Sequence, residues 1–115
     1  MVRGPSPALF ALALGALLAG AASCAAPTLP LPPPETEVGP PNELGIVEVR
    51  GTGAEALSVV VCENTDDQGQ VGAARSDDAG AFVVALRAVP GDLIECYYFV
   101  GFDRSEPSSP IPVPE

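Results

Sequence analysis

The side chains that could carry chemistry are unevenly represented: the chain has fifteen acidic residues, five arginines and three cysteines, but neither histidine nor lysine. Without histidine no Ser-His or Cys-His nucleophile pair can form, and without lysine there is no Ser-Lys pair or Schiff base. Paired carboxylates remain at Asp66-Asp67 and Asp77-Asp78, but both pairs fall in turn-like segments of a small domain with little room for a cleft. The sequence contains neither a phosphate-binding loop nor a dinucleotide fingerprint. We therefore predict a protein that is not an enzyme, with no catalytic residues and no small-molecule substrate.

The same four aspartates support one cofactor hypothesis. Asp66, Asp67, Asp77 and Asp78, together with Glu63, offer the hard oxygen ligands of which Ca²⁺ takes about six to eight. A weak calcium site would form if the two loops met at one end of the domain. The alternative is that these aspartates cap backbone donors in turns, and their spacing matches neither an EF-hand nor a repeat calcium motif. We expect no tightly bound cofactor or metal, with weak Ca²⁺ binding as the open alternative.

The N-terminal segment has the order of an export signal. Arg3 precedes an apolar run over residues 8–19, and small residues at 20–23 lead to Cys24. The run is too short for a bilayer core, which needs roughly 20 residues, and its basic start and small C-terminal residues are typical of signal peptides. The segment resembles the signal peptide of a bacterial lipoprotein, in which leucine is commonest where this chain has Ala21.

This resemblance implies a location. Residues 1–23 would form a signal helix that is removed, and a lipid on Cys24 would attach the mature chain to a membrane of the bacterial cell envelope. Ala25 follows the cysteine where an aspartate would retain a lipoprotein at the inner membrane, which favours the outer membrane. Ordinary secretion after cleavage behind Ala21, and an uncleaved anchor, are the alternatives.

Net charge limits the partners. Residues 24–115 carry four arginines against fifteen acids, a formal charge of −11. A polyanion of this size repels nucleic acid and anionic lipid headgroups. We therefore expect no nucleic-acid partner.

If Cys24 carries lipid, as the resemblance implies, Cys62 and Cys96 remain as a pair. Disulfides persist in the oxidising compartments that exported proteins reach, and we predict a Cys62–Cys96 bond. It would close a loop of roughly 35 residues and contribute about 3–4 kcal/mol on the chain-entropy model. With only two thiols and no histidine, a metal site there is not expected.

The remainder divides into a spacer and a domain. Seven of the fifteen residues from Pro27 to Pro41 are proline, which favours extended polyproline II structure. We expect a signal peptide over 1–23, the lipidated cysteine and a disordered proline-rich tether over 24–43, and a folded domain over 44–115. At ~3.1 Å per residue the tether would reach roughly 60 Å.

Residues 44–115 alternate short apolar runs with turn signals. We expect strands over 45–50, 57–64, 70–76, 81–87 and 92–101, with a weak one near 111–113. The segments Asp77–Val84 and Gly101–Ser108 resemble turns of the bacterial immunoglobulin-like modules of surface proteins, and carboxypeptidase-regulatory-like sandwiches share much of this pattern. Both families imply an all-β, Greek-key sandwich of about six or seven strands.

An aromatic cluster completes the sequence evidence. Given the disulfide, Cys96 and Tyr98 share the core face of their strand, whereas Tyr97 and Phe99 point the other way. Tyr97 and Phe99 would then form an exposed patch for a glycan or an envelope protein, unless the strand twists or the 105–115 tail covers it. We expect a lipid-anchored domain with a structural or interaction role, and a glycan- or protein-binding adhesin module, with or without Ca²⁺, is the alternative.

Overall fold

The computed structural model describes residues 29–115, so the expected signal peptide and Cys24 lie outside the described residues. The described part is built from strands alone, and residues 29–115 contain no helix of the length and apolarity needed to cross a membrane. The eight strands are β1 (Glu35–Val38), β2 (Ile46–Thr52), β3 (Val59–Asn64), β4 (Val71–Arg75), β5 (Phe82–Arg87), β6 (Leu93–Val100), β7 (Asp103–Arg104) and β8 (Ile111–Pro112).

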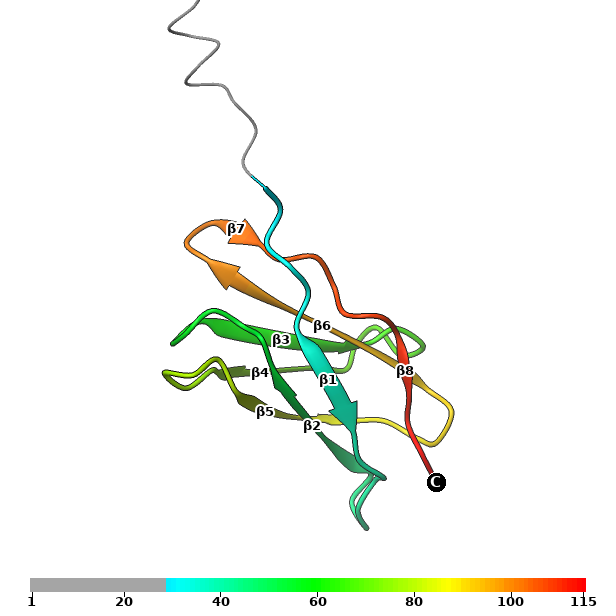
Figure 1. The fold of residues 1–115 in the computed structure, drawn as a ribbon. Coiled ribbons are helices and arrows are strands. Elements are labelled where there is room, and N and C mark those ends of the chain that lie inside the picture. The colour runs from blue at the N-terminus through cyan, green and yellow to red at the C-terminus, as the bar shows by residue number, and fades with distance from the viewer. Residues whose placement is uncertain (1–28) are drawn as a thin grey trace, which may run out of the picture.

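The strands form two antiparallel sheets. One sheet has the order β1-β2-β5, and the other runs β4-β3-β6, with β7 and β8 both paired to β6. The chain passes from one sheet to the other between β2 and β3, between β4 and β5, and between β5 and β6 (Figure 1). The predicted all-β sandwich is confirmed, and every expected strand is present within one or two residues at nearly every end.

Alternation of side chains along each strand creates the core. Successive side chains of a strand point to opposite faces, so every second residue is buried between the sheets. Strand β5 shows the pattern most clearly, with strict alternation of buried and exposed positions from Phe82 to Arg87. The fully buried side chains, at 1% exposure or less, are Val47, Val49, Val60, Cys62, Asn64, Val84, Ile94 and Cys96.

Strand β1 corrects the expected domain boundary. Residues 35–38 were expected within a disordered tether, but they pair with β2 in a four-residue register from Glu35↔Thr52 to Val38↔Val49. Upstream, Pro34 is buried and the Leu31 carbonyl accepts a hydrogen bond from the Glu106 N–H at 3.1 Å. The prolines on either side of β1 do not interrupt it, and an edge strand tolerates such neighbours because one side needs no donors. The ordered domain therefore begins near residue 31, well before residue 44.

The predicted disulfide is present, and it joins adjacent strands of one sheet. Cys62 of β3 and Cys96 of β6 are direct cross-strand partners with Cα atoms 4.1 Å apart. The Cys96 N–H and carbonyl bond instead to the Ser108 hydroxyl and N–H, at 2.9 and 2.8 Å. Cys62 and Cys96 therefore form a non-hydrogen-bonded pair, the type with the closer Cα atoms.

Two buried serines attach the C-terminal tail to the other edge of β6. Ser108 bonds Cys96 in both directions, and Ser105 does the same for Tyr98: its hydroxyl accepts the Tyr98 N–H at 3.0 Å and its own N–H donates to the Tyr98 carbonyl at 2.8 Å. Each serine thus supplies a hydroxyl acceptor in place of a backbone carbonyl. The tail closes an edge that would otherwise be open to pairing with other chains.

Asn64 organises the end of the sandwich remote from the chain entry. It is 1% exposed, its amide donates to the Asp92 carboxylate at 2.8 Å, and its side-chain oxygen accepts from the Asp66 and Asp67 N–H groups at 3.0 and 3.1 Å. The Asn64 bond, followed by a bond from the Val89 N–H, holds the pKa of Asp92 below its ordinary value. A buried amide with all these partners links two loops without leaving an unpaired polar group.

Candidate interaction surface

The exposed face of the larger sheet carries the predicted aromatic residues. Along β6, Ile94, Cys96 and Tyr98 are buried, whereas Tyr97 and Phe99 are half-buried on the opposite face. This confirms the expected division of the strand. On β3, Val61 and Val59 pair with Tyr97 and Phe99, respectively, so valines extend the same face. We call Val59, Val61, Tyr97, Phe99 and Arg104 the aromatic face.

The rings on the aromatic face support one another and are capped by a cation. Tyr97 and Phe99 pack edge to face with centroids 5.6 Å apart, and the Arg104 guanidinium lies 4.7 Å from the centre of the Tyr97 ring. Edge-to-face pairs and cation–π contacts are each attractive, and they reduce the exposure of the rings. Burial, then the neighbouring Glu63 carboxylate, raise the pKa of Tyr97, with Arg104 acting in the opposite direction. The face combines apolar area with a phenol, and Glu63 and Arg104 each lie close to that phenol.

The structure separates the four aspartates of the calcium hypothesis. Asp66 and Asp67 lie in the β3–β4 turn, whereas Asp77 and Asp78 follow β4, so the two pairs are about one five-residue strand, ~17 Å, apart. The Asp66 carboxylate accepts the Leu93 N–H at 2.8 Å. Between residues 29 and 115, no group of three or more His, Cys, Asp or Glu side chains converges as metal ligands would. The condition for a calcium site, that the two loops meet at one end of the domain, is not met within one chain, because the connections before and after β4 lie at opposite ends of that strand.

Asp77 instead caps its own turn. One carboxylate oxygen accepts the N–H groups of Ala81 and Ala79, both at 2.9 Å. These bonds favour the ionised form and hold the pKa of Asp77 below its ordinary value, with the Ala81 bond the larger cause. Asp77 therefore caps backbone donors in a turn, which is the alternative to calcium binding that the sequence left open.

The Asp77 turn predicts a specific response to acid. A carboxylate whose pKa is lowered by folding stabilises the fold fully above its unfolded-state pKa, about 3.9, and loses that contribution as the pH falls through the folded-state value. Asp77→Asn keeps an oxygen acceptor but does not titrate. We expect the melting temperature of Asp77→Asn to fall less than that of the wild type between pH 5 and pH 2, as measured by circular dichroism. Parallel curves for the two proteins would contradict this account of the turn.

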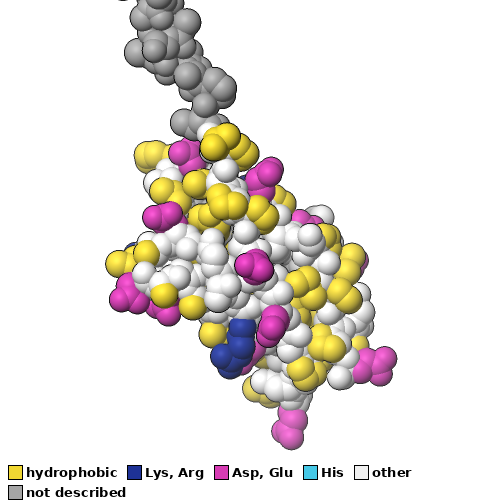
Figure 2. Space-filling view, in the orientation of Figure 1, with side chains coloured by type: hydrophobic (Ala, Val, Ile, Leu, Met, Phe, Trp, Pro, Cys, Tyr) yellow, Lys and Arg dark blue, Asp and Glu magenta, His cyan; other side chains and the backbone are white. Residues whose placement is uncertain are grey.

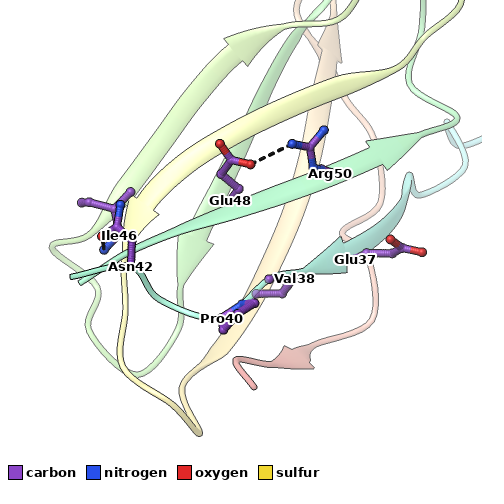
Figure 3. A pocket seen from close by; sticks show the side chains of 8 residues that line it. Glu37, Val38, Pro40, Asn42, Ile46, Glu48 and Arg50 are labelled. Atoms are coloured by element: carbon purple, nitrogen blue, oxygen red, sulfur yellow. Dashed lines mark hydrogen bonds and ion pairs between the residues drawn. The ribbon is translucent and has the colours of Figure 1, made fainter. Parts of the chain in front are cut away.

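A hollow also lies on the outer side of β1 and β2. It encloses about 340 Å³ and is lined by Glu37, Glu48, Arg50 and residues of the 39–45 loop (Figure 3). Glu48 and Arg50 form an exposed ion pair at 2.9 Å, and the Asn42 side-chain oxygen accepts the N–H of Leu44 at 2.8 Å. The side chains that line it include acids, an arginine and an amide, but no nucleophile with a neighbouring base.

Three contributors to the exposed surface were not anticipated. Val59 and Val61 sit in an uninterrupted valine run, which hides the alternation that a strand imposes. Arg104 approaches Tyr97 only because β7 folds back beside β6, and the local sequence does not specify this pairing.

Searches for related family models, curated proteins and solved structures found no match to this chain.

Proposed function

We propose that this protein is a lipid-anchored, non-catalytic display domain of a bacterial cell envelope. The observation that carries the proposal is the order of the N-terminal segment, in which Arg3, the apolar residues 8–19 and the small residues 20–23 lead directly to Cys24. Leu31 is only seven positions after Cys24, and it is the first of residues 29–115 with a backbone hydrogen bond to the rest of the domain. The lipid would therefore hold a compact sandwich at the membrane, and Ala25 after the cysteine favours the outer membrane.

Two features of the folded domain support this proposal. The Cys62–Cys96 disulfide suits an oxidising compartment outside the cytoplasm. The surplus of acids over arginines keeps the displayed domain from adsorbing to nucleic acid or to anionic surfaces. In this proposal the protein acts by presenting a stable surface at a fixed location.

A substitution at the proposed attachment residue tests the anchor. In cells fed a labelled fatty acid, Cys24→Ala is expected to abolish labelling of the protein completely, because no other residue would accept the lipid. Ser23→Ala is the matched control, since it exchanges one small residue for another beside the same cysteine and should keep the label. Equal labelling of Cys24→Ala and Ser23→Ala would reject the lipoprotein proposal.

The aromatic face favours a second candidate, recognition of a glycan or a protein of the envelope. Its rings pack edge to face on the outer face of the larger sheet, and aromatic side chains in such patches often dominate binding energies. Recognition of a glycan or a protein through the aromatic face does not require Ca²⁺.

Oligosaccharides of the cell wall are a direct probe of the second candidate. If the rings bind them, Tyr97→Ala should weaken affinity at least about thirtyfold, the equivalent of about 2 kcal/mol for a dominant side chain. Val83→Ala is the control, because Val83 is exposed on the smaller sheet. Titrations followed by NMR that show no binding, or equal binding by both variants, would count against glycan recognition.

A further inference from the structure

One end of the sandwich is defined by where the chain enters it. Leu31 is held there by the Glu106 N–H, just beyond β7. The same end carries the β2–β3 loop, the β4–β5 turn and the β6–β7 turn, while the 39–45 loop and the C-terminus lie at the other end (Figure 1). We call the former the entry end.

Large apolar side chains project from the entry end. Phe102, in the β6–β7 turn, is completely exposed, Leu29 is 90% exposed and Leu57 is 58% exposed. Figure 2 shows hydrophobic side chains gathered where the described chain begins, with acidic side chains among them. Exposed apolar residues are ordinary, and the opposite end also exposes Leu44, Val71 and Val89, so it is the chain entering here, together with this exposure, that makes the entry end a candidate contact surface.

Leu57 carries a second, independent signal. Its φ is +55°, and it is the single non-glycine residue with positive φ among residues 29–115. A branched side chain in the left-handed region is strained, and glycine or asparagine would adopt this backbone more easily. The fold therefore accepts strain at a position where the side chain faces outward, as is found at functional surfaces.

Leu57 and Phe102 lie on neighbouring loops. The register that pairs Val59 with Phe99 places Leu57 opposite Gly101 when it is continued past the strand ends. Val59, 41% exposed, and the half-buried Phe99 then connect these loops to the aromatic face. Apolar side chains are therefore exposed both at the entry end and at the adjoining end of the aromatic face.

The length of chain between Cys24 and Leu31 limits how far the entry end can lie from Cys24. Leu31 is seven residue-to-residue steps after Cys24, and a fully extended chain spans at most ~3.6 Å per step, so the reach is about 25 Å or less. This limit holds for any conformation of the intervening residues and is far below the roughly 60 Å expected of a full proline tether. Whatever holds Cys24 must lie close to the entry end.

We propose that the entry end rests on the lipid bilayer, with Phe102, Leu57 and Leu29 in the interfacial layer. This inference rests on the lipid anchor proposed above. Aromatic and leucine side chains partition favourably into that layer, and an anchor makes even a weak contact effective by keeping the local concentration high. Asp103 and Glu106 flank the contact, so zwitterionic lipid is expected to be bound better than anionic lipid.

The chain contains no tryptophan, which permits a single-tryptophan test. Phe102→Trp and, as the matched control at the far end, Leu44→Trp are prepared in the full processed protein and reconstituted into phosphatidylcholine vesicles. Leu44 is 72% exposed, so both reporters begin in water. We expect a blue-shifted emission and quenching by bromine-labelled lipid for Phe102→Trp, and neither for Leu44→Trp.

A second substitution separates a lipid contact from a purely structural role. Leu57→Asn, combined with Phe102→Trp, should relieve backbone strain and raise the midpoint of urea unfolding. It should also lower the inserted fraction about tenfold, because a buried leucine contributes roughly one order of magnitude to partitioning. Greater stability with unchanged quenching would overturn the assignment of Leu57 to the contact.

The outcomes distinguish this inference from the anchor itself. A processed protein whose intact mass lacks lipid refutes the anchor. A lipidated protein whose two tryptophans respond alike in vesicles leaves the anchor intact and overturns the lipid contact. A Phe102→Trp shift seen only in native membranes, and not on pure lipid, would also overturn it, because the entry end would then bind a membrane protein.

Discussion

Removing the disulfide by replacing both Cys62 and Cys96 with alanine is expected to lower the free energy of unfolding of the mature protein by at least about 3–4 kcal/mol. The bond links positions 34 residues apart, so it restricts the unfolded chain over a long loop. Both cysteines are fully buried, and the truncation also removes packed sulfur atoms from the core. For a domain of this size the loss is a large part of the total stability.

Urea unfolding at 25 °C measures this effect. The wild type under reducing conditions is the control, because it breaks the same bond but retains both sulfur atoms. It should lie between the oxidised wild type and the double variant. If the reduced protein unfolds within about 0.5 kcal/mol of the oxidised one, the bond is not a principal source of stability.

Gly72→Ala is expected to destabilise the domain by at least about 2–3 kcal/mol, although it adds one methyl group. Gly72 lies near the start of β4, where that strand of the larger sheet approaches Val84 and Ala85 of β5 in the smaller sheet. A Cβ there would collide with the Ala85 carbonyl oxygen and press against the Val84 side chain. Because the first obstacle is backbone, relief requires moving one sheet relative to the other.

Gly69→Ala provides the matched control in the turn before the same strand. A Cβ at Gly69 would meet its nearest neighbour, the Asp67 carboxylate, at an ordinary 3.9 Å. We expect this variant to unfold within about 0.5 kcal/mol of the wild type or to be slightly more stable, since alanine restricts the unfolded chain. Thermal and urea unfolding compare the two variants, and equal losses would show that the contact of Gly72 with β5 is not tightly packed.

The strands were predictable because local patterns determine them. Alternation along 82–87 and 93–100, and the Gly- and Asp-containing turns between runs, gave elements that tertiary packing did not override. β1 was missed because the prolines around it dominate the composition. Its pairing with β2 depends on a neighbour that local sequence does not reveal.

The surface was predictable only in part. The opposite facing of Tyr97 and Tyr98 follows from strand geometry, and the disulfide fixed which side is core. The Arg104 contact with Tyr97 and the left-handed backbone of Leu57 arise from how strands return beside one another, so no short window of sequence contains them. The calcium hypothesis failed for a similar reason, since acidic turns close in sequence lie at opposite ends of β4.

The intact mass of the processed protein, extracted from membranes in detergent, tests the central claim most directly. We predict a chain that begins at Cys24 and carries the mass of a diacylglycerol and an acyl group, with a gain of two hydrogen masses on reduction of the Cys62–Cys96 bond. A chain that begins at Ala22 without lipid would contradict the anchored display domain and would indicate a secreted sandwich with one spare thiol.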